Sequence, residues 1–198
     1  MKVTSIERLD PHCDASVQSL AQVYQNIFGN DPGWQEGYEC RMCQTTIPLS
    51  SGGGACKRCG TLLLECWPLA KIVSDFLQEM QKSKAVCLVA YDQSEIVGFT
   101  WGYCVIVTKD LGEHLDAPDL EKLVCGDMFY LDEVAVLPEY QGQGVGTSLL
   151  HSLFAQQNQT HVLLRTLEGR TMHQLALKMG GNVLCSISKQ RVMMTIPL

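Results

Sequence analysis

The stretch from Phe129 to Phe154, FYLDEVAVLPEYQGQGVGTSLLHSLF, restricts the fold more than any other part of the chain. It begins with β-branched and apolar residues, continues into a turn that contains Pro138, and ends with apolar residues at helical spacing. The glycines of the turn leave main-chain N–H groups accessible at the positive end of a helix dipole, because no side chains block the approach. This order of strand, glycine-rich turn and helix is typical of a phosphate-binding site.

The spacing of the glycines excludes two common nucleotide motifs. A dinucleotide fingerprint reads G-x-G-x-x-G and has an acidic residue about twenty positions later, whereas this turn reads G-x-G-x-G. A Walker loop needs the sequence Gly-Lys-Ser/Thr, and the turn contains no lysine. The phosphate must therefore belong to another kind of ligand.

The same stretch resembles the acyl-CoA-binding motif of the GNAT superfamily of N-acetyltransferases, Gln/Arg-x-x-Gly-x-Gly/Ala. Gln141, Gly144 and Gly146 match this motif. In the family, the motif follows a strand that ends in hydrophobic-Ala-Val-x-Pro, and this chain has such a strand end. The resemblance implies that main-chain groups of the strand pair with pantetheine and that the N–H of Val134 polarises the thioester carbonyl of acetyl-CoA. The residues that the resemblance assigns to acetyl-CoA are Val134, Ala135, Val136, Gln141, Gly142, Gln143, Gly144, Val145, Gly146 and Thr147.

Composition indicates one globular domain over residues 1–198. The chain is 46% apolar and 18% charged, which argues against disorder. No apolar run has the length of a signal peptide core or a membrane span, so we expect a cytoplasmic protein with no membrane partner. A net charge of −6 argues against a general nucleic-acid binder.

Four cysteines in two pairs predict a metal site within residues 34–66. Cys40 and Cys43 form the first C-x-x-C pair, and Cys56 and Cys59 form the second. Each pair can present two sulfurs from one tight turn, and two such turns close a tetrahedron around Zn²⁺. Disulfides, a redox pair or iron are the alternatives. Four protein ligands leave no open position, so we expect a structural zinc ribbon inserted between the first two helices.

The other elements follow the order of a GNAT fold, which implies an α/β architecture with a mixed sheet. Val97, Gly98 and Phe99 match a Val-Gly-Phe that the family carries in its second hairpin strand. The expected strands cover residues 2–9, 86–91, 96–107, 161–167, 182–188 and 191–198, and the other expected helices cover 14–28, 68–82 and 171–180.

Asp132 and Glu133 are the candidate general bases. Strand alternation predicts that Asp132 shares one face with Val134 and Val136, whereas Glu133 lies on the other. Polyamine acetyltransferases of the family have a similar Tyr-Leu-acid-acid sequence, so we expect Asp132 to deprotonate the acceptor amine, directly or through water. Glu133 is the second candidate, because a bulge in this strand would exchange the faces.

The general acid of the family has no equivalent at the matching position. The family's tyrosine falls on Ala176, so the leaving thiolate is protonated by another group. His173 lies one turn earlier, but a lone histidine on a short helix is more often a surface residue. Solvent is a second source of the proton, since the pKa of a thiol is close to neutrality.

The leading hypothesis is transfer of acetyl from acetyl-CoA to the primary amine of a small-molecule acceptor. The acidic residues Glu113, Asp116, Asp119 and Glu121, in the connection at 108–127, would give a negative rim that favours a cationic amine, although a solvated loop is the simpler interpretation. The alternatives are an acetyltransferase for peptides or proteins, and a non-catalytic acyl-CoA-binding module whose ribbon binds a protein or nucleic acid. The sequence leaves the acceptor and a homodimer open.

Overall fold

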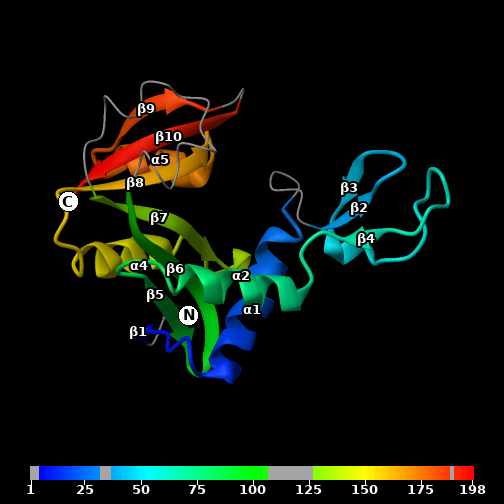
Figure 1. Cartoon of the computed structure of the whole chain (residues 1–198), viewed down its shortest axis with the longest axis horizontal. Helices are drawn as coiled ribbons and strands as arrows, with labels where there is room; N and C mark the ends of the chain where they lie inside the picture. The colour runs from blue at the N-terminus through cyan, green and yellow to red at the C-terminus, as the bar shows by residue number, and fades with distance from the viewer. Residues whose placement is uncertain (1–4, 32–36, 107–126, 188–189) are drawn as a thin grey trace.

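The structure is a computed structural model that describes residues 5–31, 37–106, 127–187 and 190–198. The main sheet is built from β1 (Ser5–Arg8), β5 (Val86–Asp92), β6 (Glu95–Ile106), β7 (Asp127–Val136), β8 (His161–Leu167), β9 (Asn182–Ser186) and β10 (Arg191–Pro197). Its seven strands have the order β1-β5-β6-β7-β8-β10-β9 (Figure 1). Neighbouring strands are antiparallel except β7 and β8, which are parallel. The expected mixed α/β sheet is confirmed.

Helices cover both faces of the sheet. They are α1 (Asp14–Phe28), α2 (Leu69–Glu79), α4 (Val145–Phe154) and α5 (Thr171–Lys178). Residues of α1 and α2 share one core with Phe99 of β6. Val97, two residues earlier on the same strand, belongs with Leu149 of α4 to another core, which also contains residues of β8 and α5. Within the described ranges, no helix has the length and hydrophobicity to cross a bilayer.

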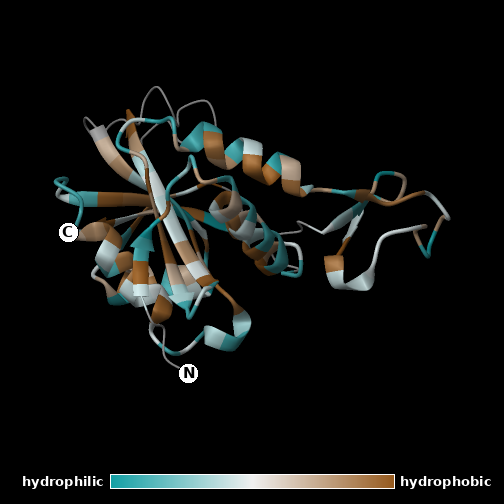
Figure 2. Ribbon diagram, turned by 90° about the horizontal axis from the view of Figure 1, so that it is seen from below, coloured by the Kyte–Doolittle hydropathy of each residue, from teal (hydrophilic) through white to brown (hydrophobic). Residues whose placement is uncertain are grey.

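A second, small sheet lies between α1 and α2 in the chain. It consists of β2 (Tyr38–Cys40), β3 (Thr45–Ile47) and β4 (Leu64–Glu65), in the order β3-β2-β4, with a short 3₁₀ helix at Leu49–Ser51. Both views show this part standing out to one side of the main domain (Figures 1 and 2). We call it the ribbon, residues 37–66.

A β-bulge in β7 overturns the predicted distribution of its side chains. Trp101 of β6 lies opposite Glu133, but the next residue, Gly102, lies opposite Leu131, so Asp132 is an extra residue in β7. The extra residue reverses the alternation of faces after it. Val134 packs towards α4 with Leu131, and Glu133 lies on the face of Trp101, towards α1 and α2. Strict alternation was therefore the wrong assumption for this strand, and the bulge considered as its alternative is present.

Gly102 allows β6 and β7 to approach closely at the bulge. A Cβ atom at this position would overlap the carbonyl oxygen of Tyr130 and lie 2.7 Å from the ring of Phe129, which is fully buried. Neither neighbour is the free end of a flexible chain. The glycine is thus required by packing and not by backbone conformation.

We expect Gly102→Ala to lower the free energy of unfolding by about 1–3 kcal/mol, because it overpacks the sheet beside the bulge. Gly146→Ala is the matched control, since its Cβ would meet Val136 at an ordinary 3.6 Å. Denaturant unfolding of both variants measures the difference. Equal stabilities for the two variants would show that β7 moves away without cost.

Candidate active site

The glycine-rich turn joins β7 to α4 and exposes its main chain. Gly144, with φ 85°, is the N-cap of α4, and Gly142 has φ 72°. A Cβ at either position would meet no atom within 4 Å. A left-handed conformation favours glycine, and the open space beside both residues leaves the N–H groups at the start of α4 accessible.

Side chains within the turn hold its shape. Gln141 donates from Nε2 to the carbonyl oxygen of Val136 at 2.9 Å, and Gln143 donates to that of Glu139 at 2.8 Å. The hydroxyl of Tyr140 donates to Asp92 Oδ2 at 2.8 Å and so ties the turn to the end of β5. Both glutamines were predicted to bind the cofactor. Their amides are used inside the turn, so the groups best placed for a ligand are main-chain amides.

The strand before the turn separates from its neighbour. Among the described residues, β7 pairs with β8 only over Phe129–Leu131, and the divergence begins at the bulge. Val134 and Val136 therefore have no β8 partner on that side. Such a split edge of a sheet offers main-chain groups that an extended ligand can pair with.

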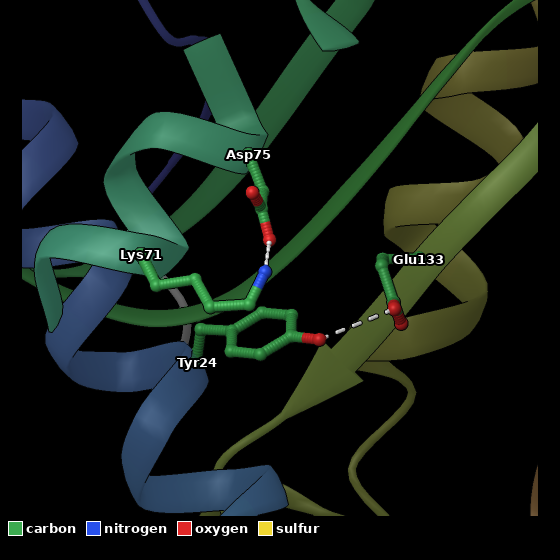
Figure 3. A network of polar contacts seen from close by, with 4 residues as sticks. All are labelled: Tyr24, Lys71, Asp75 and Glu133. Carbon is green, nitrogen blue, oxygen red and sulfur yellow. Dashed lines mark hydrogen bonds and ion pairs between the residues drawn. The ribbon is translucent and has the colours of Figure 1, made fainter. Parts of the chain in front are cut away.

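The bulge brings both candidate bases to the face covered by α1 and α2. Tyr103 donates its hydroxyl proton to Asp132 Oδ2 at 3.2 Å, and the indole N–H of Trp101 reaches the same oxygen at 3.4 Å. Tyr24 of α1 directs its hydroxyl towards Glu133 Oε1 at 3.5 Å (Figure 3). Both carboxylates are half-buried among aromatic rings.

A third carboxylate, which the sequence analysis did not identify, completes this cluster. Trp101 donates from Nε1 to Glu79 Oε2 at 2.8 Å, so Glu79, the last residue of α2, lies beside Asp132. A signal was available, because Glu79 follows the buried residues Ile72 and Phe76 at helical spacing and so falls on the apolar face of α2. We call Glu79, Asp132 and Glu133 the acidic cluster.

The cluster changes the ionisation of its members. Burial, together with the charge of Asp132, raises the pKa of Glu79 to about 8. Burial and the Asp132 charge also raise the pKa of the Tyr103 and Tyr130 hydroxyls, so both tyrosines stay protonated hydrogen-bond donors at neutral pH. The ammonium of Lys82 lies 3.7 Å from the centre of the Tyr103 ring. The site therefore combines negative charge with aromatic faces, a combination that favours a cation.

On the other side of the sheet, α5 presents Ala176 and His173 to the interior. Ala176 is fully buried, and His173 is only 8% exposed, which corrects the expectation of a surface histidine. Neither ring nitrogen of His173 has a hydrogen-bond partner among the described residues. The acid-rich segment at 108–127 lies outside the described residues except for Asp127, the first residue of β7.

The four predicted cysteines lie close together in the ribbon. The Sγ atoms of Cys40, Cys43, Cys56 and Cys59 all lie within 4.8 Å of one another. The distance from Cys40 to Cys59 is 3.4 Å and that from Cys43 to Cys56 is 3.9 Å. A disulfide has a sulfur separation of about 2.05 Å, whereas the edge of a Zn(Cys)₄ tetrahedron with bonds of about 2.3 Å is about 3.8 Å. The geometry and the donor set fit Zn²⁺.

Comparisons with known proteins agree with this arrangement. Residues 83–180 match the family described as acetyltransferase (GNAT) domain. This segment contains β5 to α5, and with it the split strand and the glycine-rich turn. The chain therefore contains an acetyltransferase domain of the GNAT family. A comparison with curated proteins found no significant match.

Solved structures of the same fold cover almost the whole chain at low identity. One is the PaiA N-acetyltransferase from Thermoplasma acidophilum in complex with coenzyme A, at 12% identity, TM-score 0.57 and 100% coverage of both chains. A ribosomal-protein alanine N-acetyltransferase from Escherichia coli has 14% identity and TM-score 0.55, covering 98% of this chain and 92% of that one. An aminoglycoside 6′-acetyltransferase type Ii has 13% identity and TM-score 0.57, with coverages of 98% and 97%.

Proposed function

We propose that this protein transfers an acetyl group from acetyl-CoA to the primary amine of a cationic small-molecule acceptor. The observation that carries the acceptor class is the acidic cluster, because its carboxylates lie among Trp101, Tyr103 and Tyr24 on one face of the split sheet. An ammonium ion is stabilised both by the negative charge and by the aromatic faces.

Acetyl-CoA is assigned to the split edge of β7 and to the glycine-rich turn that follows it. The main-chain N–H groups from Gln141 to Thr147 bind the pyrophosphate, with Gly142 and Gly144 providing the open approach. The main chain of Val134, Ala135 and Val136 pairs with pantetheine, and the N–H of Val134 points its dipole at the thioester carbonyl. The thioester supplies an activated acetyl group.

The residues of the acidic cluster prepare the acceptor. An alkyl ammonium has a pKa near 10, so only about one molecule in a thousand is nucleophilic at neutral pH. Asp132 accepts the proton, with Glu133 as the second candidate, and the neutral amine attacks the acetyl group directly. The departing thiolate needs a proton, which solvent or the buried His173 supplies.

A peptide or protein acceptor is the second candidate. The ribbon stands beside α1 and α2, the helices that cover the acidic cluster, and it exposes the apolar side chains of Met42 and Leu62. Known structures with this fold include enzymes for a ribosomal protein and for aminoglycosides. A panel of polyamines, aminoglycosides, amino acids and peptides, assayed by release of the CoA thiol, separates the two acceptor classes.

Calorimetry with coenzyme A and acetyl-CoA tests the proposal at its first step. We expect one molecule of either ligand to bind per chain. Gly144→Ala should weaken binding about tenfold, because a Cβ obstructs the pyrophosphate and strains the turn. Gly52→Ala in the ribbon is the matched control, since Gly52 has a similar φ of 76° and an equally open surrounding. No heat with the unmodified protein, or equal effects of the two variants, would contradict the assignment.

A further inference from the structure

One indole hydrogen serves two carboxylates in the acidic cluster. Trp101 of β6 donates from Nε1 to Glu79 at 2.8 Å and approaches Asp132 at 3.4 Å. These residues come from three elements, the end of α2, the centre of β6 and the bulge of β7. The two acidic oxygens therefore face the same hydrogen atom, and both carboxylates are only partly exposed to water.

Two ionised carboxylates in this position repel each other, so the pair needs a proton or a cation between its members. Asp132 also accepts a hydrogen bond from the Tyr103 hydroxyl. The other ionisable groups that act on the pair or on its tyrosine neighbours are Lys82, Tyr130, Glu133 and Arg165. Lys82 favours the ionised form of Glu79, but burial and Asp132 oppose it more strongly.

We propose that Glu79 and Asp132 act as one acid–base unit and that this pair, rather than Asp132 alone, removes the proton from the acceptor's ammonium group. This inference rests on the proposed function and adds Glu79 to its mechanism. The ionised pair takes one proton from R–NH₃⁺, which leaves R–NH₂ and one proton held between the two carboxylates. Attack on the thioester forms the amide, and the second amine proton leaves with the thiolate or to solvent.

A pair of carboxylates binds a proton more tightly than a single carboxylate, so it is the better base for an ammonium group. An isolated aspartate, with a pKa near 4, is about a millionfold too weak to deprotonate an ammonium with a pKa near 10. The raised pKa of Glu79, about 8, reduces this mismatch to about a hundredfold. Interacting carboxylates titrate as a unit, so the more basic value belongs to the pair.

The indole resonance of Trp101 tests the pair without any turnover. In protein labelled with ¹⁵N-tryptophan and assigned with Trp101→Phe, we expect the Trp101 N–H signal to titrate with a midpoint near pH 8. Glu79→Gln should abolish this titration, because the amide still accepts the hydrogen bond but carries no proton. A Trp101 signal that does not move between pH 6.5 and 9.5, or that titrates unchanged in Glu79→Gln, would overturn the proposal.

The pH dependence of kcat/KM tests the catalytic role. In the unmodified enzyme we expect kcat/KM for a cationic acceptor to fall about tenfold per pH unit below pH 8. Glu79→Gln should move this acidic limb of the pH profile at least about one unit to lower pH, because the remaining base is weaker. For the same reason, the maximal kcat/KM at high pH should fall about tenfold or more. Glu7→Gln on β1 removes the same charge from an exposed position and should leave both unchanged.

The two experiments separate failure of the pair from failure of the proposed function. A titrating indole in a protein that acetylates no amine would support the pair and contradict the proposed activity. An active enzyme whose limb is the same in Glu79→Gln and Glu7→Gln would keep the activity and reject the pair. Asp132→Asn should move the indole titration to lower pH without removing it, since Glu79 keeps its bond to the indole but loses the neighbouring charge that helps to raise its pKa.

Discussion

Asp132→Asn should lower kcat about a hundredfold or more, with little change in the affinity for acetyl-CoA. The substitution keeps the shape of the side chain and its hydrogen bond from Tyr103, but an amide cannot accept the proton of the acceptor. Thiol release under saturating acceptor measures kcat, and calorimetry measures the affinity for acetyl-CoA. We expect kcat and the affinity for acetyl-CoA to respond differently because the cofactor is assigned to main-chain groups of β7 and of the glycine-rich turn, and not to the Asp132 side chain.

A matched control substitution shows whether the loss of one negative charge lowers kcat by itself. Asp14→Asn changes an exposed aspartate at the start of α1, far along the chain from the acidic cluster, and should leave kcat unchanged. If Asp132→Asn keeps a near-normal rate and an unshifted pH profile, Asp132 is not the base. Glu133→Gln would then be the informative variant, since the bulge places Glu133 on the same face.

The faces of β7 show what a single sequence does and does not predict. The glycines, the apolar strand and the helical stripe are local patterns, so the turn and its flanking elements follow from the sequence of residues 129–154. The bulge is not local, because it depends on how Trp101 and Gly102 pair with β7. Without the structure, Asp132 and Glu133 were assigned to opposite faces. Their actual proximity is the feature that creates the acidic cluster.

Glu79 was not identified from the sequence, and His173 was expected at the surface, for the same reason. Helical spacing places Glu79 on the apolar face of α2, but only the packing of α2 on β6 brings it to Trp101. His173 was expected at the surface because α5 is short, yet α5 packs against β8 and β10 and buries it. The assignment of the family's tyrosine position to Ala176 stays a prediction, since it rests on matching Lys178-Met179-Gly180-Gly181 to the family's sequence. A sequence shows which residue type occupies a position, but it does not show which residues that side chain contacts in the folded protein.

The cysteines of the ribbon are the opposite case, because their chemistry is local. Each C-x-x-C pair needs only one tight turn, and the structure brings the two pairs together. The size of the ribbon's hydrophobic core indicates whether the ribbon depends on metal to fold. That core consists of Cys40, Cys56 and Leu63, with few partly buried neighbours. Its three strands span two or three residues each, too little to fold without a further constraint.

Cys40→Ser should therefore remove bound zinc and unfold the ribbon while the main domain stays folded. Structural zinc contributes about 10–16 kcal/mol of binding free energy at neutral pH, which far exceeds what so small a core supplies. Elemental analysis measures the metal, expected at about one zinc per chain in the unmodified protein, and it distinguishes zinc from iron. Hydrogen exchange measures order, with protection lost in 37–66 and retained in β5, β6 and α4. Cys13→Ser, at an exposed cysteine outside the cluster, is the matched control.

The contacts at the base of the ribbon decide how far unfolding spreads. Gln25 of α1 donates to Glu65 at 2.6 Å and to the carbonyl oxygen of Trp67 at 3.0 Å, and the carbonyl oxygen of Gly29 accepts from the N–H of Leu49 at 2.8 Å. These bonds reach the end of α1 but not the core between α1 and the sheet, so their loss should fray only that helix end. Loss of the whole fold in Cys40→Ser would contradict this expectation and make the ribbon part of the core. Loss of activity with an intact main domain would instead favour a ribbon that contacts the acceptor.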